Sequence, residues 1–319
     1  MKCMEMEQPE KIYRYRSFSE QTIDSLCMDQ LYFANPNSFN DPMDCQPTIE
    51  SDSDNDELSV ILTELVKNRV EAETLLSLSS ARINNEGSKN YATNLGVNSA
   101  KDELSRIAYN STNPDYEDDG INREQAQNWL LLCEVQRELL SKYSKGVCCF
   151  SSTYDNSLLW SHYGDQHQGF CIGYGLDRNP KPELHKVIYD DNRVLHTSLI
   201  SKAILAKDLD AQKQLDDNIL LRKATPWKYE DEWRLFSKIG LNDSPLAMTD
   251  ITFGLRCPDS IIHTVVNALN GRNDGIEFYQ MQQTRGSYEL CRELIDGEIS
   301  AYFPRVAQSG IEIFGPINS

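Results

Sequence analysis

Residues 146–175 read GVCCFSSTYDNSLLWSHYGDQHQGFCIGYG and contain the clearest structural pattern in the chain. Two apolar runs, GVCCFSS and GFCIGYGL, lie on either side of a short segment, NSLLWSHYG, that has the spacing of a helix. Short apolar runs bounded by turn residues are typical of buried strands. The stretch therefore predicts two strands of a sheet with a short helix between them.

Further elements are predicted on both sides of this stretch. Upstream, KIYRYR (11–16) alternates as a strand, with tyrosines on one side and arginines on the other. A helix follows, capped by Ser19, and then a short strand, LYFA, and a structured loop, NPNSFNDPMD (35–44). Downstream we expect a strand in HKVIYD, a helix over about 199–223, a turn entering a strand in TPWKYEDEWRLFSK, and a strand, helix and strand in DITFGL, DSIIHTVVNALNG and IEFYQMQ.

The middle of the chain has a different character. Residues 51–125 hold 15 acidic and 7 basic residues, and their apolar positions recur at helical spacing. A capping-box pattern from Asn122 to Gln125 opens a further helix. We expect a single α+β domain with a mixed or split sheet. In it, 11–50 and 146–281 form a sheet-centred core, 51–145 are an acidic helical insertion, and 282–319 are a C-terminal extension.

Composition excludes several classes of protein. The 319 residues include 49 acidic and 31 basic side chains, a net charge of −18, which argues against nonspecific nucleic-acid binding. No apolar run is long enough for a membrane span, and the amino terminus has no signal-peptide core. The cysteines are odd in number and scattered, so we expect reduced thiols, a cytoplasmic protein and no zinc site. They are Cys3, Cys27, Cys45, Cys133, Cys148, Cys149, Cys171, Cys257 and Cys291.

The first candidate site is KYEDEWRLF (228–236). On a strand, Glu230, Glu232 and Arg234 share one face. Two carboxylates about 7 Å apart beside a guanidinium would bind a ribose hydroxyl pair and stabilise a developing positive charge. The alternative interpretation is that the same residues form a solvent-facing ladder of salt bridges.

The second candidate lies in SLLWSHYGDQHQGFCIGY (157–174). His162 and Tyr163 share a short helix with Trp160, and His167 follows in the loop. The two histidines are five positions apart and miss the spacing of a helical zinc pair, so we expect no metal. The alternative is that Trp160 and Tyr163 anchor the core and His162 is a packing residue.

The third candidate combines Arg14 and Arg16 with SFNDP (38–42). Guanidinium groups suit bidentate phosphate contact, and Asn40 and Asp41 would orient a loop around a ligand. Alternatively, the loop is an Asx-type turn and the arginines pair with acidic residues. The chain has no GxGxxG, GxxxxGK[ST], GxSxG or HExxH motif. The sequence therefore does not support the dinucleotide-binding, P-loop, α/β-hydrolase and zinc-protease classes that these motifs mark.

These segments together resemble domain-of-unknown-function family 2971, a bacterial family often met near phage-defence genes. The resemblance runs from about residue 11 to 281 and rests on ordered motifs. They are IYRYRSF, SFNDPMD, CCFSSTYDNSLLWSHYGDQHQGFCIGY, KVIYD, WKYEDEWRLF, DITFGLRCP and, more weakly, IEFYQM.

The order of these elements is also similar to the ADP-ribosyltransferase fold. That resemblance implies that Arg14 or Arg16 holds NAD, that Ser151, Ser152 or Tyr154 lies at the nicotinamide, and that Glu232, with Glu230 two before it, directs transfer. It implies an NAD-consuming transferase or glycohydrolase acting as a toxin or phage-defence effector on an unknown macromolecule. The alternative is a noncatalytic sensor or interaction module. We expect one cleft with catalytic residues Glu232, Glu230, Tyr163 and His162 and nucleotide-binding residues Arg14, Arg16, Phe39, Asn40, Asp41, Ser151, Ser152, Tyr154, Trp160 and Arg234.

Overall fold

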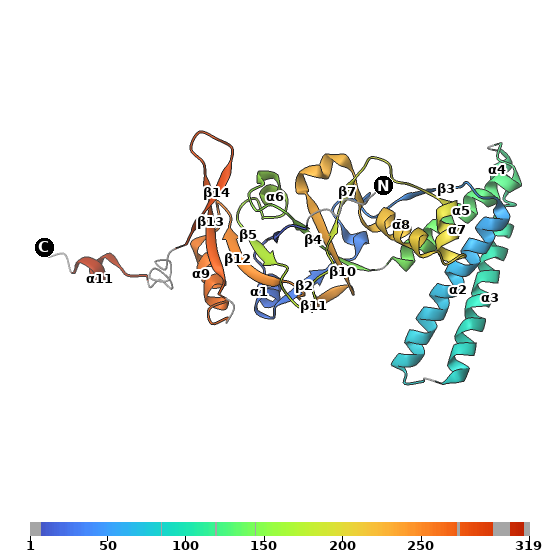
Figure 1. Ribbon diagram of the computed structural model, residues 1–319, viewed down its shortest axis with the longest axis horizontal. Coiled ribbons are helices and arrows are strands. Elements are labelled where there is room, and N and C mark those ends of the chain that lie inside the picture. Colours follow the sequence, from blue (N-terminus) through green and yellow to red (C-terminus); the bar gives the residue numbers. More distant parts are fainter. Residues whose placement is uncertain are drawn as a thin grey trace.

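A mixed sheet of eight strands forms the centre of the computed structural model, which describes residues 8–83, 85–118, 120–143, 145–272, 275–295 and 307–315 (Figure 1). All neighbouring strands are antiparallel except β12 and β13, which are joined by the crossover helix α9 (Asp259–Ala268). The predicted combination of helices with a mixed sheet is therefore confirmed. From one edge to the other, the strands are β14 (Leu290–Leu294), β13 (Glu277–Gln283), β12 (Ala247–Phe253), β5 (Phe170–Gly175), β1 (Lys11–Arg16), β4 (Gly146–Ser151), β10 (Glu232–Ser237) and β6 (His185–Lys186).

The stretch 146–175 folds into β4, the short helix α6 (Ser157–His162) and β5, as its pattern predicts. The two strands are not neighbours, because β1 lies between them and is antiparallel to both. Every residue of β5 is buried, which explains its unbroken apolar character. The amino-terminal strand is therefore part of the same core as the downstream strands.

β1 and β4 separate soon after they meet. Six residues of β1 pair with β5, but only Tyr13 has a ladder partner on β4, which is Ser151. The other end of β4 pairs through Val147 with Ala34, the residue after β2 (Gln30–Phe33). β2 continues into a separate two-stranded sheet with β11 (Gly240–Asp243). The sheet is thus split between β1 and β4, and the split leaves a wedge-shaped space.

The acidic middle segment forms helices whose buried side chains pack in a cluster separate from the main core of the sheet. Asp54 caps the first helix through the Glu57 N–H, and the predicted capping box from Asn122 to Gln125 is present. The two longest helices, α2 and α3, form a hairpin that extends away from the sheet (Figure 1). The helices are α2 (Asn55–Ser80), α3 (Glu86–Asn110), α4 (Pro114–Asp118) and α5 (Arg123–Lys142).

The helix predicted over 199–223 is wrong in one respect, because the structure has two helices there, α7 (Thr197–Ile204) and α8 (Leu209–Leu220). Asp208 separates them, since its side chain caps α8 by accepting from the Asp210 and Ala211 N–H groups. Their buried side chains pack in the same cluster as α2 and α5 rather than on the sheet. The helical core therefore includes residues from the segment that the sequence analysis assigned to the sheet-centred core.

Short elements connect the sheet with the helices. The predicted cap of α1 (Glu20–Cys27) is present, because the Ser19 side chain accepts from the Thr22 N–H. The connecting elements are η1 (Pro36–Ser38), β3 (Thr48–Glu50), β7 (Ile188–Tyr189), β8 (Val194–His196), β9 (Arg222–Lys223) and η2 (Thr225–Glu230). A short helix, α11 (Gly310–Phe314), lies in the C-terminal extension, of which 296–306 and 316–319 are outside the described residues.

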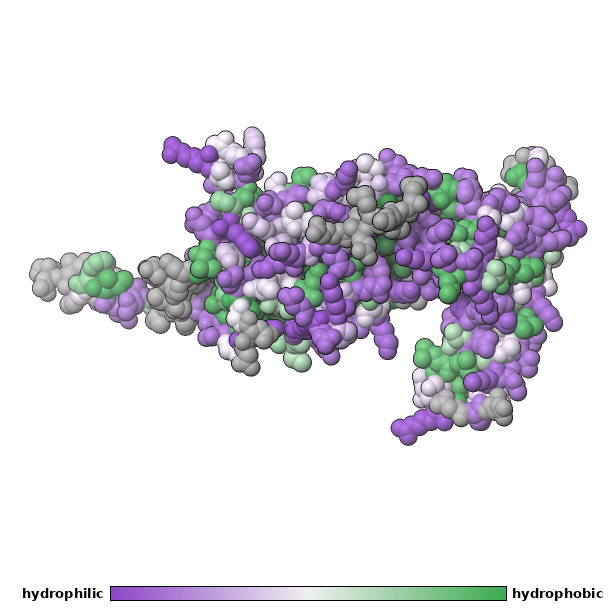
Figure 2. Space-filling model, in the orientation of Figure 1, coloured by the Kyte–Doolittle hydropathy of each residue, from purple (hydrophilic) through white to green (hydrophobic). Residues whose placement is uncertain are grey.

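The surface is largely hydrophilic on the face shown in Figure 2, in keeping with the acidic composition. Hydrophobic side chains gather at the free end of the α2–α3 hairpin, where Leu76, Ile83 and Tyr91 are exposed. Within the described residues, no helix is long and apolar enough to cross a membrane. The described cysteines are all free thiols, and Cys3 lies outside the described residues.

Candidate functional site

A cavity of about 370 Å³ occupies the wedge between β1 and β4. Such a volume lies within the range of small-molecule sites. One wall is β1, another is β4, and a third is the loop 35–44. The lining residues are Tyr13, Arg14, Tyr15, Arg16, Ala34, Ser38, Phe39, Asn40, Asp44, Val147, Cys149, Phe150, Ser151, Leu159, Tyr163, Lys223, Glu230 and Glu232.

The β1 wall is positively charged. The Arg14 Nη2 donates to the Tyr32 carbonyl at 2.9 Å, and its guanidinium lies 5.9 Å from the Phe150 ring centroid. Burial and the like charge of Arg14 both lower the pKa of Arg16. Neither arginine forms an ion pair with a carboxylate among the residues that the structure describes. Arg14 and Arg16 therefore line the cavity as two cationic residues that have no carboxylate partner within the described part of the chain.

The opposite wall is built around a buried lysine. Lys223, on β9, donates from Nζ to both Glu230 and Glu232, and its distance to the Glu232 Oε2 is 2.8 Å. The same Nζ lies 3.6 Å from the Asp44 Oδ2. The Trp227 ring packs over the ammonium group at 5.2 Å from the ring centroid. Three carboxylates from three segments thus meet at one cation.

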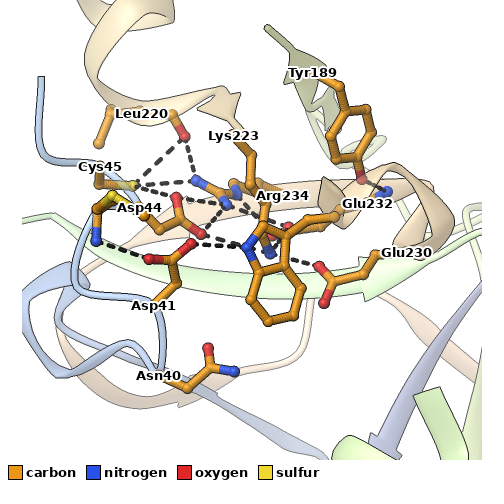
Figure 3. Close-up of polar contacts among 12 residues, drawn as sticks. Asn40, Asp41, Asp44, Cys45, Tyr189, Leu220, Lys223, Glu230, Glu232 and Arg234 are labelled. Atoms are coloured by element: carbon orange, nitrogen blue, oxygen red, sulfur yellow. Dashed lines mark hydrogen bonds and ion pairs between the residues drawn. The ribbon is translucent and has the colours of Figure 1, made fainter. Parts of the chain in front are cut away.

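Arg234 completes this wall from behind (Figure 3). It is fully buried, and its Nε donates to the Glu232 Oε1 at 2.7 Å. Its Nη2 donates to Asp44 at 2.8 Å, and its Nη1 donates to the Leu220 carbonyl at 2.7 Å. We call Asp44, Lys223, Glu230, Glu232 and Arg234 the acidic cluster, since it contains three carboxylates and two cations.

The two glutamates of the acidic cluster differ in their environments. Burial alone would raise the pKa of Glu232, but the nearby charges of Arg234 and Lys223 outweigh it and lower that pKa to about 2. Burial raises the pKa of Glu230, although Lys223 opposes the shift. A pair of carboxyl groups whose pKa values are pushed apart is the usual arrangement for an acid or base beside a fixed charge. Glu230 is therefore the member of the pair that holds its proton to the higher pH.

Glu230 is also hydrogen bonded across the cavity. The Tyr163 hydroxyl donates to its Oε1 at 2.8 Å, and the Asn40 Nδ2 donates to that hydroxyl at 3.2 Å. Burial, followed by the charge of Glu230, raises the pKa of Tyr163, so the phenol stays protonated and remains a donor. Asn40 of the loop, Tyr163 at the C-cap of α6 and Glu230 therefore form one chain of hydrogen bonds along the cavity.

The segment 228–236 is not a continuous strand, which corrects the sequence prediction. The 3₁₀ turn η2 begins at Thr225, has Pro226 in its first turn and ends at Glu230, and Asp231 takes a left-handed conformation with φ of 40°. β10 begins only at Glu232. The two glutamates approach the same lysine because of this turn, not because they alternate along a strand.

Most of the predicted site residues line the cavity together, and six do not. Those that line it are Arg14, Arg16, Phe39, Asn40, Ser151, Tyr163, Glu230 and Glu232.

Two of the other six residues support the acidic cluster or the loop. Arg234 lies behind Glu232, as described above, and is not a lining residue. Asp41 is buried beside the cavity and accepts the Trp227 indole N–H at 2.8 Å.

The remaining four residues have other partners. His162 is exposed and packs against the rings of Trp227 and Tyr229. Ser152 hydrogen bonds with Asp231. Trp160 is a buried core residue whose indole N–H donates to the Tyr154 carbonyl at 2.8 Å. Trp160 therefore has the core-packing role that the sequence analysis gave as the alternative.

The sequence analysis missed Lys223 and Asp44 as members of the site. Asp44 stands in the quoted loop NPNSFNDPMD, beside candidates that were chosen, so its position was a usable signal. Lys223 stands alone in the polar segment RKATP and carries no motif. Only the pairing of β9 with β7 brings it under the two glutamates.

Comparison with known proteins bears on part of this region. Residues 159–235, which are 77 of the 319, match the model of a family described as Protein of unknown function (DUF2971). The match supports the family predicted from the motifs, and that description assigns no activity. It includes Tyr163, Lys223, Glu230, Glu232 and Arg234, so all of the acidic cluster except Asp44 lies inside it. Neither the curated proteins nor the solved structures contain a match to this chain.

Proposed function

We propose that the cavity between β1 and β4 binds NAD as a substrate. The chain would then be an ADP-ribosyltransferase-like effector that modifies a macromolecule or hydrolyses NAD, as a toxin or phage-defence protein. The observation that carries the proposal is the opposition of charge across one cavity. Arg14 and Arg16 line the cavity without an ion-pair partner among the described residues, and the acidic cluster opposite holds one carboxylate more than its cations.

NAD has complementary charges at its two ends. Its diphosphate is anionic and suits a pair of guanidinium groups, which bind phosphate through charge-assisted hydrogen bonds. Its nicotinamide ring is a pyridinium cation, which a carboxylate in a low-dielectric site stabilises. Glu230 is the lining carboxylate with the weaker cationic compensation, because Lys223 is its one ion-pair partner among the described residues, whereas Glu232 pairs with both Lys223 and Arg234.

The chemistry follows from the same arrangement. When the bond between the ribose C1′ and the nicotinamide nitrogen breaks, the electron pair goes to the ring and leaves neutral nicotinamide. The ribose becomes an oxocarbenium-like cation, which the Glu230 carboxylate stabilises electrostatically. Water or a macromolecular nucleophile then bonds to C1′ and releases its proton to Glu230, whose pKa is raised by burial. In this scheme Glu232 is a positioning residue that holds Lys223 and Arg234.

A second function remains a candidate because the acidic cluster is already satisfied internally. Glu230 receives hydrogen bonds from both Tyr163 and Lys223 without any ligand. A noncatalytic sensor or interaction module of a phage-defence system would use the same cavity to bind a nucleotide or protein without turning it over.

The test is NAD binding by calorimetry together with release of nicotinamide, alone and with cell lysate. Glu230→Gln leaves two carboxylates and two cations in the acidic cluster, so the variant should fold and lose about 10²-fold or more in turnover. Arg16→Gln should weaken NAD binding about tenfold to a hundredfold, through lost hydrogen bonds of ~1.5–3 kcal/mol. Arg285→Gln, an exposed arginine on the β13–β14 turn, is the matched control and should change neither.

The outcomes separate the two functions. Binding that depends on Arg16 but gives no nicotinamide release would favour the sensor. Equal turnover of wild type and Glu230→Gln would remove that carboxylate from the mechanism. If the wild type does not bind NAD, NAD is rejected as the ligand for both of the proposed functions.

A further inference from the structure

A second large cavity, about 930 Å³, forms a groove between α8 and the end of β10. It shares no lining residue with the cavity between β1 and β4. Leu209, Gln212, Lys213 and Asp216 form its helical wall. Leu235, Phe236 and Ser237 of β10 lie along it, and the segment 180–183 with His185 forms the other side.

The groove exposes an incomplete edge of the main sheet. β6 is the last strand and pairs only with Trp233 and Arg234 of β10. The Glu232 carbonyl accepts from the Val187 N–H at 2.9 Å, so the backbone groups of Glu232 face this edge. Backbone direction alternates along a strand, and Phe236 therefore presents its N–H and carbonyl to the same edge. Among the described residues, Phe236 has no ladder partner on this side.

The chain before β6 leaves this edge uncovered. Pro180 and Pro182 precede β6, and a proline has no N–H to continue a ladder. Instead of pairing with Phe236, this segment forms the far side of the groove. The His185 and Phe236 rings lie 5.2 Å apart and mark where the pairing stops.

The walls suit an uncharged strand better than a highly charged one. Apolar surface comes from Phe236, from the prolines and from Leu209, which is 84% exposed. Asp216 is engaged by the Tyr143 hydroxyl and by Gln212. Those donors are neutral, so Asp216 still counts among the charged groups, which nearly balance with three lysines against four carboxylates and a histidine. They are Lys145, Lys181, Lys213, Glu183, Asp216, Asp217, Asp243 and His185.

We propose that this groove binds an extended, predominantly apolar peptide segment of a partner protein, which adds to β10 as a strand in line with β6. An open strand edge beside a helix is a common mode of peptide recognition, in which backbone hydrogen bonds give affinity and the flanking wall gives selectivity. Here Phe236 supplies the backbone pair and Leu209 supplies apolar contact from α8. This peptide site is separate from the proposed NAD site and does not depend on it.

The probe is a library of random peptides displayed on phage, selected against the full chain and followed by synthesis of the enriched sequences. Selected peptides should be apolar at alternate positions and should slow hydrogen exchange at the Phe236 amide. Phe236→Pro removes that N–H without touching the ladder to β4, and should weaken binding about tenfold or more. Leu209→Asp, at an exposed helical position, should weaken it by a similar factor and tests the site without changing the sheet.

The control is the opposite edge of the same sheet. The Ile295 N–H donates to Phe278, so by alternation the Leu294 N–H on β14 faces away from β13. Leu294→Pro should leave peptide binding unchanged. The proposal fails if no peptide is enriched, if enriched peptides bind Leu209→Asp as tightly as wild type, or if they protect β14 in place of Phe236.

Discussion

Two buried ion clusters lie on the same sheet and use the same kinds of side chain differently. On β12, Asp250 is fully buried, and its carboxylate forms ion pairs with Arg292 at 2.7 Å and with Lys11 at 3.1 Å. The Arg292 guanidinium lies between the rings of Tyr154 and Tyr279, at 4.2 and 4.1 Å from their centroids. This cluster has two cations for one carboxylate, whereas the acidic cluster beside β10 has two cations for three.

The difference shows which cluster has charge available for a ligand. A Cβ at Gly173 would lie 2.4 Å from the Asp250 Oδ2, so the carboxylate fills the space above the neighbouring strand. Its contacts tie β1, β12 and β14 together, which is a structural role. The acidic cluster instead borders a cavity, and its carboxylate in excess, Glu230, lines that cavity. The Asp250 cluster also has unequal charges, and its Lys11 lines a separate cavity of about 1020 Å³. The two clusters therefore differ in the sign of the charge that faces a cavity, which is a carboxylate beside β10 and an ammonium group beside β12.

The largest expected effect comes from breaking the acidic cluster. Arg234→Met leaves Asp44 and Glu232 buried with Lys223 as their one remaining cation, and removal of one partner from a buried ion pair costs ~3–5 kcal/mol. Urea unfolding should show that loss in the free energy of unfolding. Arg137→Met removes an arginine whose side chain is 59% exposed and should cost under ~1 kcal/mol. Equal stability of the two variants would contradict the structural role of Arg234.

Acid should weaken the same cluster. The folded pKa of Glu232 is about 2, below its ordinary value of 4.5. Its contribution to stability is therefore complete above pH 4.5 and is lost as pH falls through about 2. The difference in unfolding free energy between wild type and Glu232→Gln should shrink by on the order of 3 kcal/mol across that window. A difference that does not vary with pH would show that Glu232 is not held ionised.

Much of the fold could be predicted from the sequence because its signals are local. The strands at 11–16, 146–151 and 170–175 show their apolar patterns directly, and so do the capped helices of the acidic segment. Strand neighbours depend on contacts across long sequence separations, and nothing local shows that β1 lies between β4 and β5. The break at Asp208 was visible as an N-cap residue, but the apolar spacing on both sides suggested one helix.

Site residues that stand in a sequence motif could be predicted, whereas residues that only tertiary packing brings to the site could not. Arg14, Arg16 and the two glutamates stand in quoted motifs and line one cavity. The pairing of both glutamates with Lys223 required the turn at Asp231, since alternation on a strand gave the right residues for a different geometric reason. A single lysine has no spacing to detect, so its role depends on tertiary structure alone.

A smaller effect is expected from the Asp250 cluster. Arg292→Met removes one of two cations but leaves Lys11 and the Thr249 hydroxyl, which donates to Asp250 at 2.9 Å. The loss in unfolding free energy should be about 1.5–3 kcal/mol, the value of a hydrogen bond to a charged group. NAD binding should not change, because Arg292 is not a lining residue of the cavity. Weaker NAD binding at unchanged stability would reverse the roles assigned to the two clusters.

The smallest expected effect is at Tyr163. Tyr163→Phe removes the hydroxyl that donates to Glu230 and should cost ~1 kcal/mol in unfolding free energy, as for one hydrogen bond. That bond lowers the pKa of Glu230, so its loss should raise the pKa further.

Two measurements check this shift. Carboxyl NMR should show the midpoint of Glu230 moving to higher pH, and if the carboxylate is catalytic, the acidic limb of the rate profile should move with it. The control is Tyr229→Phe, which removes a hydroxyl one position from Glu230 that has no hydrogen bond among the described residues. Equal shifts in both variants would mean that general changes in burial, and not the Tyr163 hydrogen bond, set the ionisation of Glu230.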